Sequence, residues 1–163
     1  MNASSGDADG QQLPELIQGW SKVLWSPQAV ALGMEAMVEA EFACATLKIP
    51  YRADLVGDPD SGVIAGGVVT TLLDHTCGHA VGMAMTRAAP MATLDLRIDY
   101  MRAAEPGRDI HARAHCYKLT HSIAFVRATA YDRDQSDPVA TAQAAFMLTA
   151  STPEFHTDPE IPA

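Results

Sequence analysis

The feature that most constrains the fold is the stretch 68–86, VVTTLLDHTCGHAVGMAMT, which is apolar on almost every side. Its spacing predicts one continuous α-helix, and its only charged residue is Asp74. A helix that is apolar all round must be enclosed by the rest of a soluble chain. Gly78 and Gly82 lower the helix propensity, which indicates close packing of another element against that side. The sequence therefore predicts a central, buried helix.

Four segments after this helix alternate with a period of two, which is typical of half-buried antiparallel strands. They cover residues 91–101, 109–118, 122–131 and 139–148. In the first, the alternation puts Leu94, Leu96, Ile98 and Tyr100 on one face and Asp95, Arg97 and Asp99 on the other. The predicted inner faces of the other three are rich in alanine, whose small side chain lets a sheet curl closely around a helix.

Ahead of the helix, residues 35–55 predict a strand, a turn and a second strand, and 57–67 predict a loop dense in Gly, Asp and Pro. The resulting ββαββββ order indicates an α+β fold with a curved antiparallel sheet around one long helix. The expected organisation is a flexible tail over 1–12 and a single domain over 13–150. A further helix is expected at about 14–25, and an irregular tail over 151–163.

Composition excludes several classes of function. The 163-residue chain has a formal net charge of −9 and no cluster of Lys or Arg, so nucleic-acid binding is not expected. No apolar run is long enough to cross a bilayer, and the N-terminus lacks the pattern of a signal peptide. We therefore expect a cytoplasmic protein that does not bind membranes. Three widely spaced cysteines, Cys44, Cys77 and Cys116, predict buried, reduced thiols rather than disulfides.

Asp74 is the residue that conflicts with its surroundings. Its helical neighbours three and four positions away are Thr70, Thr71, Cys77 and Gly78, so no local cation neutralises it. One interpretation is a structural carboxylate held by Thr70, Thr71 or a distant donor. The other, which we favour, is a general base or nucleophile facing a cavity, because a partnerless acid inside an apolar helix is costly.

Gly66 and Gly67 stand at the start of the same helix, where free backbone N–H groups can stabilise an oxyanion. The alternative is a tight turn into the helix. Asp74 follows Gly67 by seven residues, so the two share a helix face but lie roughly 10 Å apart. Both groups must come within about 3 Å of one carbonyl to act on it. Two antiparallel helices around a twofold axis would solve this, with two sites per dimer.

The stretch GVIAGGVVTTLLDHTCGHAVG resembles the PaaI-like group of hotdog-fold acyl-CoA thioesterases. These enzymes carry His-Gly-Gly, several apolar residues and then Leu-x-Asp, matched here by Ala65-Gly66-Gly67 and Leu72-Leu73-Asp74. The resemblance continues through 93–114 and 118–125 to Leu148. It implies the hotdog fold, hydrolysis of acyl-CoA, and a homo-oligomer that is a dimer or a dimer of dimers. It implies no cofactor, because coenzyme A is part of the substrate.

The resemblance also implies residue roles. Asp74 would attack the thioester or activate water, the amide of Gly66 or Gly67 would polarise the carbonyl, and Thr93 would orient the water or the acid. The segments that line the CoA arm would supply Tyr100, Lys118, Thr120, His121, Ser122 and Ile123, with Lys118 and His121 as phosphate contacts. The motif histidine is Ala65 here, and the usual polar residue of the preceding loop is missing, so Ser61 or His75 would substitute.

Three alternatives accompany this hypothesis. His75 and His79 have the i, i+4 spacing of a metal-binding pair, but Asp74 lies about 100° away around the helix and no Glu follows His75, so we expect no metal. A non-catalytic acyl-CoA binding protein would keep the pocket without turnover. A hotdog-fold dehydratase or isomerase would need a well-placed histidine before the helix, which is absent. His111 and His115 share the outer strand face with Arg113 and are expected at solvent or an interface.

Overall fold

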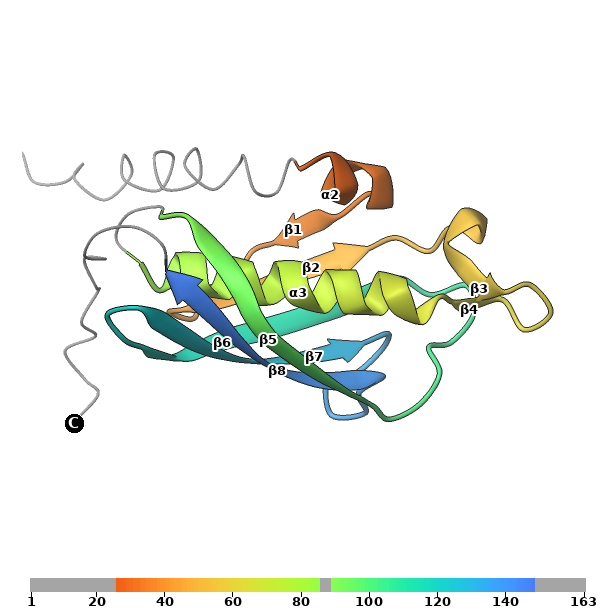
Figure 1. The fold of residues 1–163 in the computed structure, drawn as a ribbon. Helices are drawn as coiled ribbons and strands as arrows, with labels where there is room; N and C mark the ends of the chain where they lie inside the picture. The colour runs from red at the N-terminus through yellow and green to blue at the C-terminus, as the bar shows by residue number, and fades with distance from the viewer. Residues whose placement is uncertain (1–25, 86–88, 149–163) are drawn as a thin grey trace, which may run out of the picture.

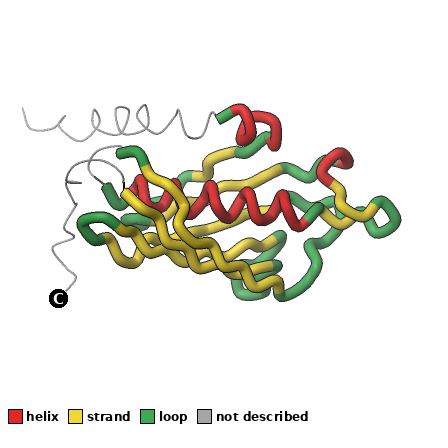
Figure 2. The backbone as a smooth tube through the Cα atoms, viewed as in Figure 1, coloured by secondary structure: helices red, strands yellow, loops and turns green. Residues whose placement is uncertain are grey.

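The computed structural model describes residues 26–85 and 89–148. Its elements in chain order are α2 (Pro27–Leu32), β1 (Glu35–Met37), β2 (Cys44–Ile49), the 3₁₀ turn η1 (Ala53–Leu55), β3 (Val56–Asp58), β4 (Val63–Ile64), α3 (Gly66–Met83), β5 (Met91–Tyr100), β6 (Ile110–Leu119), β7 (Ile123–Tyr131) and β8 (Ala140–Leu148). One antiparallel sheet has the order β1-β2-β6-β7-β8-β5, and β3 and β4 form a separate small hairpin. Figures 1 and 2 show α3 lying along the concave face of the large sheet. The predicted hotdog fold is confirmed.

Helix α3 is the core of the molecule, as its apolar pattern predicts. It packs mainly against β2, β6 and β7, and its side chains facing them are completely buried, among them Leu72, Leu73, Cys77, Ala80 and Val81. The helix begins at Gly66, two residues before the predicted start. No helix in residues 26–85 and 89–148 has the length and apolar character needed to cross a membrane.

The alanine-rich strands curve around α3 as expected. Strands β6, β7 and β8 alternate between buried and more exposed residues along almost their whole length. Their buried faces carry Ala112, Ala114, Ala124, Ala128, Ala130, Ala140, Ala142 and Ala144. Small side chains on that face let the sheet backbone approach the helix closely, which a sheet of larger residues would prevent.

Strand β5 departs from the predicted alternation at a β-bulge. Thr93 pairs with Phe146 and Asp95 with Ala145, so Leu94 is the extra residue and is 53% exposed. The prediction that Leu94 shares one face with Leu96 was therefore wrong. Opposed residues of an antiparallel pair share a face, and Phe146 is buried toward α3. The bulge thus turns Thr93 toward the helix, whereas uninterrupted alternation would have placed it outside.

The N-terminal region contains a short helix and a hairpin of two short strands that the sequence pattern did not predict. Ser26-Pro27 begins α2: the Ser26 hydroxyl accepts a hydrogen bond from the Ala29 N–H, and Pro27 stands in the first turn. The expected loop 57–67 contains the hairpin of β3 and β4, where a Cβ on Gly57 would lie 2.8 Å from the Ala65 Cα. The predicted helix at 14–25 and the tails at 1–12 and 151–163 lie outside the described residues.

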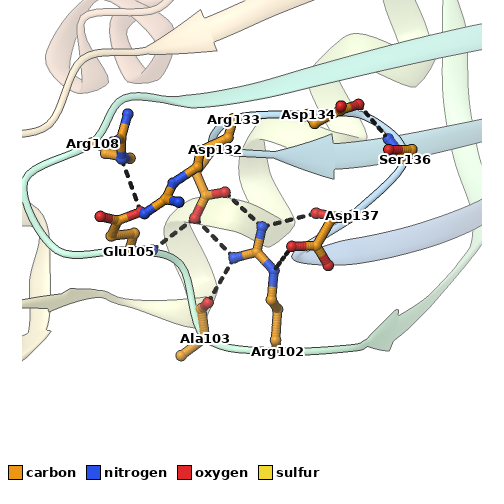
Figure 3. A network of polar contacts seen from close by, with 9 residues as sticks. All are labelled: Arg102, Ala103, Glu105, Arg108, Asp132, Arg133, Asp134, Ser136 and Asp137. Atoms are coloured by element: carbon orange, nitrogen blue, oxygen red, sulfur yellow. Dashed lines mark hydrogen bonds and ion pairs between the residues drawn. The ribbon is translucent and has the colours of Figure 1, made fainter.

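An ion-pair network fixes the loops beyond the ends of β5 and β7 (Figure 3). The guanidinium of Arg102 donates to both oxygens of Asp132, at 2.9 and 2.6 Å, and its Nε donates to Asp137 at 3.1 Å. Asp132 also accepts from the Glu105 N–H at 2.7 Å, and its side chain is only 1% exposed. Arg108 and Arg133 both pair with Glu105. The chain immediately after Tyr100 is thereby held to the β7–β8 loop.

We expect Asp132→Asn to lower the free energy of unfolding by about 2–3 kcal/mol, because an amide replaces the buried carboxylate that accepts two hydrogen bonds from the Arg102 guanidinium. The hydrogen bonds from Arg102 hold the pKa of Asp132 below its usual value. The stabilisation is therefore complete above the pKa of about 4 of an unfolded Asp and is lost as pH falls below it. Urea denaturation of both proteins across pH measures this. Asp137→Asn, at a carboxylate that is 76% exposed, is the control and should cost little.

Candidate active site

Asp74 projects from the middle of α3 and is only partly buried. The hydroxyl of Thr93 donates a 2.9 Å hydrogen bond to its Oδ1. This is the acid and the hydroxyl that the resemblance pairs, and they come from α3 and β5. The bulge in β5 makes the contact, because it directs Thr93 to the helix side. The second carboxylate oxygen, Oδ2, is not part of this bond.

Asp74 belongs to a stripe along α3 that the chain's own sheet leaves partly open. The stripe consists of Gly67, Thr70, Thr71, Asp74 and Gly78, all exposed or intermediate in burial, with the spacing of a single helix face. The opposite side carries the fully buried residues. A carboxylate on the open stripe of an otherwise enclosed helix can reach a substrate while its backbone stays rigid.

The start of α3 offers two backbone donors, the amides of Gly66 and Gly67. Ala65 is the N-cap residue and its side chain provides no capping bond. The Val68 N–H donates to the Ala65 carbonyl at 3.0 Å, whereas the two glycine amides have no hydrogen-bond partner among the described residues. A Cβ on Gly67 would meet nothing within 4 Å among the described residues. The Tyr100 hydroxyl donates to the Gly66 carbonyl at 2.7 Å and contacts the Thr70 hydroxyl at 2.9 Å. Sequence reasoning did not identify Thr70 as part of this helix end.

His75 turns away from Asp74 toward α2. Its Nδ1 lies 3.2 Å from the Thr71 carbonyl and its Nε2 lies 3.4 Å from the Ser26 hydroxyl. A carbonyl only accepts, so Nδ1 donates and Nε2 accepts from Ser26. The Ser26 side chain thus joins α2 to α3. The sequence analysis did not identify this residue. A helix-capping serine before a proline was the available signal.

His79 is only 6% exposed, and its Nε2 has no hydrogen-bond partner within residues 26–85 and 89–148. Burial, assisted by the nearby His75, lowers its pKa to about 4, so the ring is neutral at physiological pH. No group of three or more His, Cys, Asp or Glu side chains in the described part of the chain is arranged to hold a metal ion.

The remaining predicted residues lie at the two ends of α3. Ser61 is in the β3–β4 turn, where its hydroxyl donates to the Asp58 carboxylate at 2.5 Å. The Lys118–Ile123 segment is the β6–β7 turn, closed by Thr120 N–H donating to the Ile123 carbonyl at 2.8 Å. Figure 1 shows this turn at the C-terminal end of α3, opposite Gly66 and Gly67. Within one chain, then, the predicted CoA-binding turn and the predicted oxyanion donors are far apart.

The cysteines take no part in this arrangement. All three are free and buried. Burial raises the pKa of Cys44 and Cys116 to about 11 and, helped by the charge of Asp74, that of Cys77 to about 12. Cys77 is therefore not a nucleophile at neutral pH, although it lies one turn from Asp74.

Residues 61–139 match the family model described as the thioesterase superfamily. The medium/long-chain acyl-CoA thioesterase YigI of Escherichia coli is 30% identical over 132 residues, which cover 72% of this chain and 83% of that protein. A crystal structure from Pseudomonas aeruginosa has a TM-score of 0.73 and 37% identity, and covers 82% of this chain and 99% of its own. The PaaI protein of the E. coli phenylacetic acid degradation operon has a TM-score of 0.72 over 85% and 96% of the two chains; at 16% identity it is similar in fold.

We expect no cysteine of the folded protein to react with DTNB at neutral pH, because a thiol with a raised pKa inside the core supplies almost no accessible thiolate. In denaturant all three should react. Rapid reaction of one thiol in the folded protein would contradict the buried placement.

Proposed function

The chain belongs to the thioesterase superfamily, and from that premise we propose that this thioester hydrolase converts an acyl-CoA to the free acid and coenzyme A. The observation that carries the proposal is the Thr93–Asp74 hydrogen bond on the open stripe of α3. It presents an oriented carboxylate in the middle of a helix whose first turn offers the amides of Gly66 and Gly67. These are the two groups that acyl transfer requires.

Asp74 acts on the thioester in one of two ways. As a nucleophile it forms a C–O bond to the acyl carbon, the C–S bond breaks, CoA leaves as the thiolate, and water hydrolyses the resulting anhydride. As a general base it takes a proton from the water that attacks the same carbon. In both routes the carbonyl oxygen gains negative charge, which a Gly66 or Gly67 amide stabilises, and the thiolate acquires a proton on release. Thr93 holds the carboxylate in either role.

We propose that the working site lies between two copies of the chain. Gly67 and Asp74 are roughly 10 Å apart along one helix, too far to act together within one chain. Two features support a partner: the open stripe of α3, and the position of the ten-residue β5 at the edge of the sheet. A long edge strand without a neighbour favours pairing with another chain. An antiparallel second copy would also bring its Lys118–Ile123 turn to the Gly66–Gly67 end.

Medium- and long-chain acyl-CoAs are the first substrates to test, because the E. coli relative bears that name. The apolar residues Ile64, Met83 and Ala84 do not distinguish medium- and long-chain acyl groups from aryl groups. Several expectations stay predictions. We expect Lys118 and His121 to contact the CoA phosphates, and Ser61, Ala65 and His75 to take part in substrate binding. We also expect no cofactor and a cytoplasmic location. Ala65 in place of the motif histidine favours a reduced turnover, and a non-catalytic binder is the alternative that the assay distinguishes.

Asp74→Asn should reduce CoA release at least about 100-fold, because the amide keeps the shape of the side chain but is neither a nucleophile nor a base. Release is followed with DTNB on a panel of acyl-CoAs, and the buried protein thiols give little background. Asp95→Asn, at an exposed carboxylate on β5, is the matched control and should leave the rate unchanged. Undiminished release by Asp74→Asn would contradict the assignment, and binding without release by the wild type would establish the non-catalytic alternative.

Mixing two inactive variants tests the shared site. Gly67→Ala should fold normally, since its Cβ meets no described atom, but should obstruct the approach of the thioester. In a mixed dimer of Asp74→Asn and Gly67→Ala chains, one site carries both defects and the other neither. After subunit exchange roughly a quarter of the wild-type activity should return, because about half of the dimers are mixed. No recovery in mixtures shown to contain mixed dimers would place each site within one chain.

A further inference from the structure

Two cations of the described structure have no carboxylate partner, although the chain is acidic. The sequence contains 20 Asp and Glu against 11 Lys and Arg, so possible partners are plentiful. Every Lys and Arg within residues 26–85 and 89–148 forms an ion pair with a carboxylate, except Lys118 and Arg127. The paired cations are Lys48, Arg52, Arg97, Arg102, Arg108, Arg113 and Arg133. The charges of Lys118 and Arg127 are therefore available to an anion from solution.

A β-bulge puts Lys118 on the same face of the sheet as Arg127. In the pairing of β6 with β7, Cys116 opposes Val126 and Lys118 opposes Phe125, so β6 has one extra residue between them. Phe125 and Arg127 alternate with the buried residues of β7 and therefore point away from α3. Because opposed residues of an antiparallel pair share a face, Lys118 points outward as well. Without the extra residue, Lys118 would point toward the helix.

The extra residue is Tyr117, and its ring restrains the Arg127 side chain. The central carbon of the Arg127 guanidinium lies 4.3 Å from the centre of the Tyr117 ring. Stacking on a ring occupies one face of a guanidinium and leaves its N–H groups, which lie in the guanidinium plane, available to an anion. The cross-strand neighbours of Arg127 are His115 and Gln143, and neither is acidic. Arg127 is thus exposed, restrained in orientation and not opposed by a carboxylate on the adjacent strands.

Lys118 borders the β6–β7 turn that is predicted to line the CoA arm. The Leu148 N–H donates to the Ser122 carbonyl at 2.9 Å, which ties this turn to the end of β8. The pantetheine arm of coenzyme A is uncharged, whereas its nucleotide carries a 3′-phosphate and a diphosphate. A substrate whose thioester lies at α3 and whose arm passes this turn brings those phosphates to the outer face of β6 and β7. Phosphate is an anion that arginine binds through two parallel N–H groups.

We propose that Arg127, stacked on Tyr117, binds the nucleotide phosphates of coenzyme A together with Lys118 on the outer face of the sheet. The inference rests on the proposed acyl-CoA hydrolysis and deepens it, because it adds Arg127 and Tyr117 to the residues that bind the substrate. Arg127 and Lys118 supply positive charge, and the guanidinium also supplies directed N–H donors. Tyr117 is a positioning residue, because it holds the guanidinium without touching the phosphates itself.

Titration calorimetry with adenosine 3′,5′-bisphosphate tests the site directly, because this probe carries phosphates of the CoA nucleotide and no thioester. Arg127→Gln should weaken its binding about three- to tenfold, the effect of losing one charge-assisted pair at an exposed site. Arg127→Lys should fall between the two, since it keeps the charge but loses the planar fork. Arg97→Gln is the matched control and should bind like the wild type. Arg97 has the same charge and lies on the same face of the sheet, two strands away, where it is 72% exposed and paired with Asp99.

Kinetics then separate the nucleotide from the rest of the substrate. Arg127→Gln should raise KM for an acyl-CoA by a similar factor with kcat nearly unchanged, because the contact is equally strong in the ground state and the transition state. The difference from the wild type should shrink at high salt. With the corresponding S-acyl-pantetheine, which lacks the nucleotide, the rise in KM should be much smaller.

Three results would overturn the inference: no binding of the bisphosphate by the wild type, equal losses in Arg127→Gln and Arg97→Gln, or an equal rise in KM for both thioesters. If Arg127→Gln does not fold, Tyr117→Leu decides with the same readouts, because it removes the ring that restrains Arg127. Failure of the proposed function looks different. In that case the wild type releases no CoA from any acyl-CoA, while the bisphosphate titration still shows whether Arg127 binds phosphate.

Discussion

The need to enclose α3 governs the rest of the structure. A helix without an outward polar face loses stability wherever water reaches it. The sheet meets that need by curving, which its alanine face permits, yet a sheet of one chain covers only part of a helix's circumference. The stripe from Gly67 to Gly78 is the part that remains, and it carries the only charge of the helix. The same helix is therefore enclosed on one side and partly open to solvent on the other.

Much of the architecture could be predicted from the sequence because it depends on periodicity. The apolar pattern predicts the central helix, and the alternation of β6, β7 and β8 predicts the antiparallel sheet around it. The order of the elements along the chain then restricts how the strands can be connected. Asp74 stands out by the same logic, as a carboxylate among apolar neighbours. The short elements were missed because α2, β3 and β4 are too brief to establish a period. Ser26 followed by Pro27 is a helix-start signal, but the six-residue helix after it is too short to confirm that signal by its apolar pattern.

The site was less predictable, because it depends on which way side chains point across long sequence separations. Alternation alone would have directed Thr93 to the outside of the sheet, and the extra residue at Leu94 reverses this. Nothing local in the strand announces that change. Tyr100 contacts Gly66 and Thr70, which lie 34 and 30 positions before it in the sequence. Only the path of β5 along α3 reveals these contacts.

The bulge has a consequence for how this strand can vary. The number of residues before the pairing resumes at Asp95 decides which face of the sheet residues 91–93 point to. The side chain at position 94 does not decide it. Substitution of the exposed Leu94 therefore leaves the strand register unchanged. Deletion of one residue there would restore simple alternation and turn Thr93 away from Asp74, so the contact between these two residues depends on the length of the segment more than on its composition.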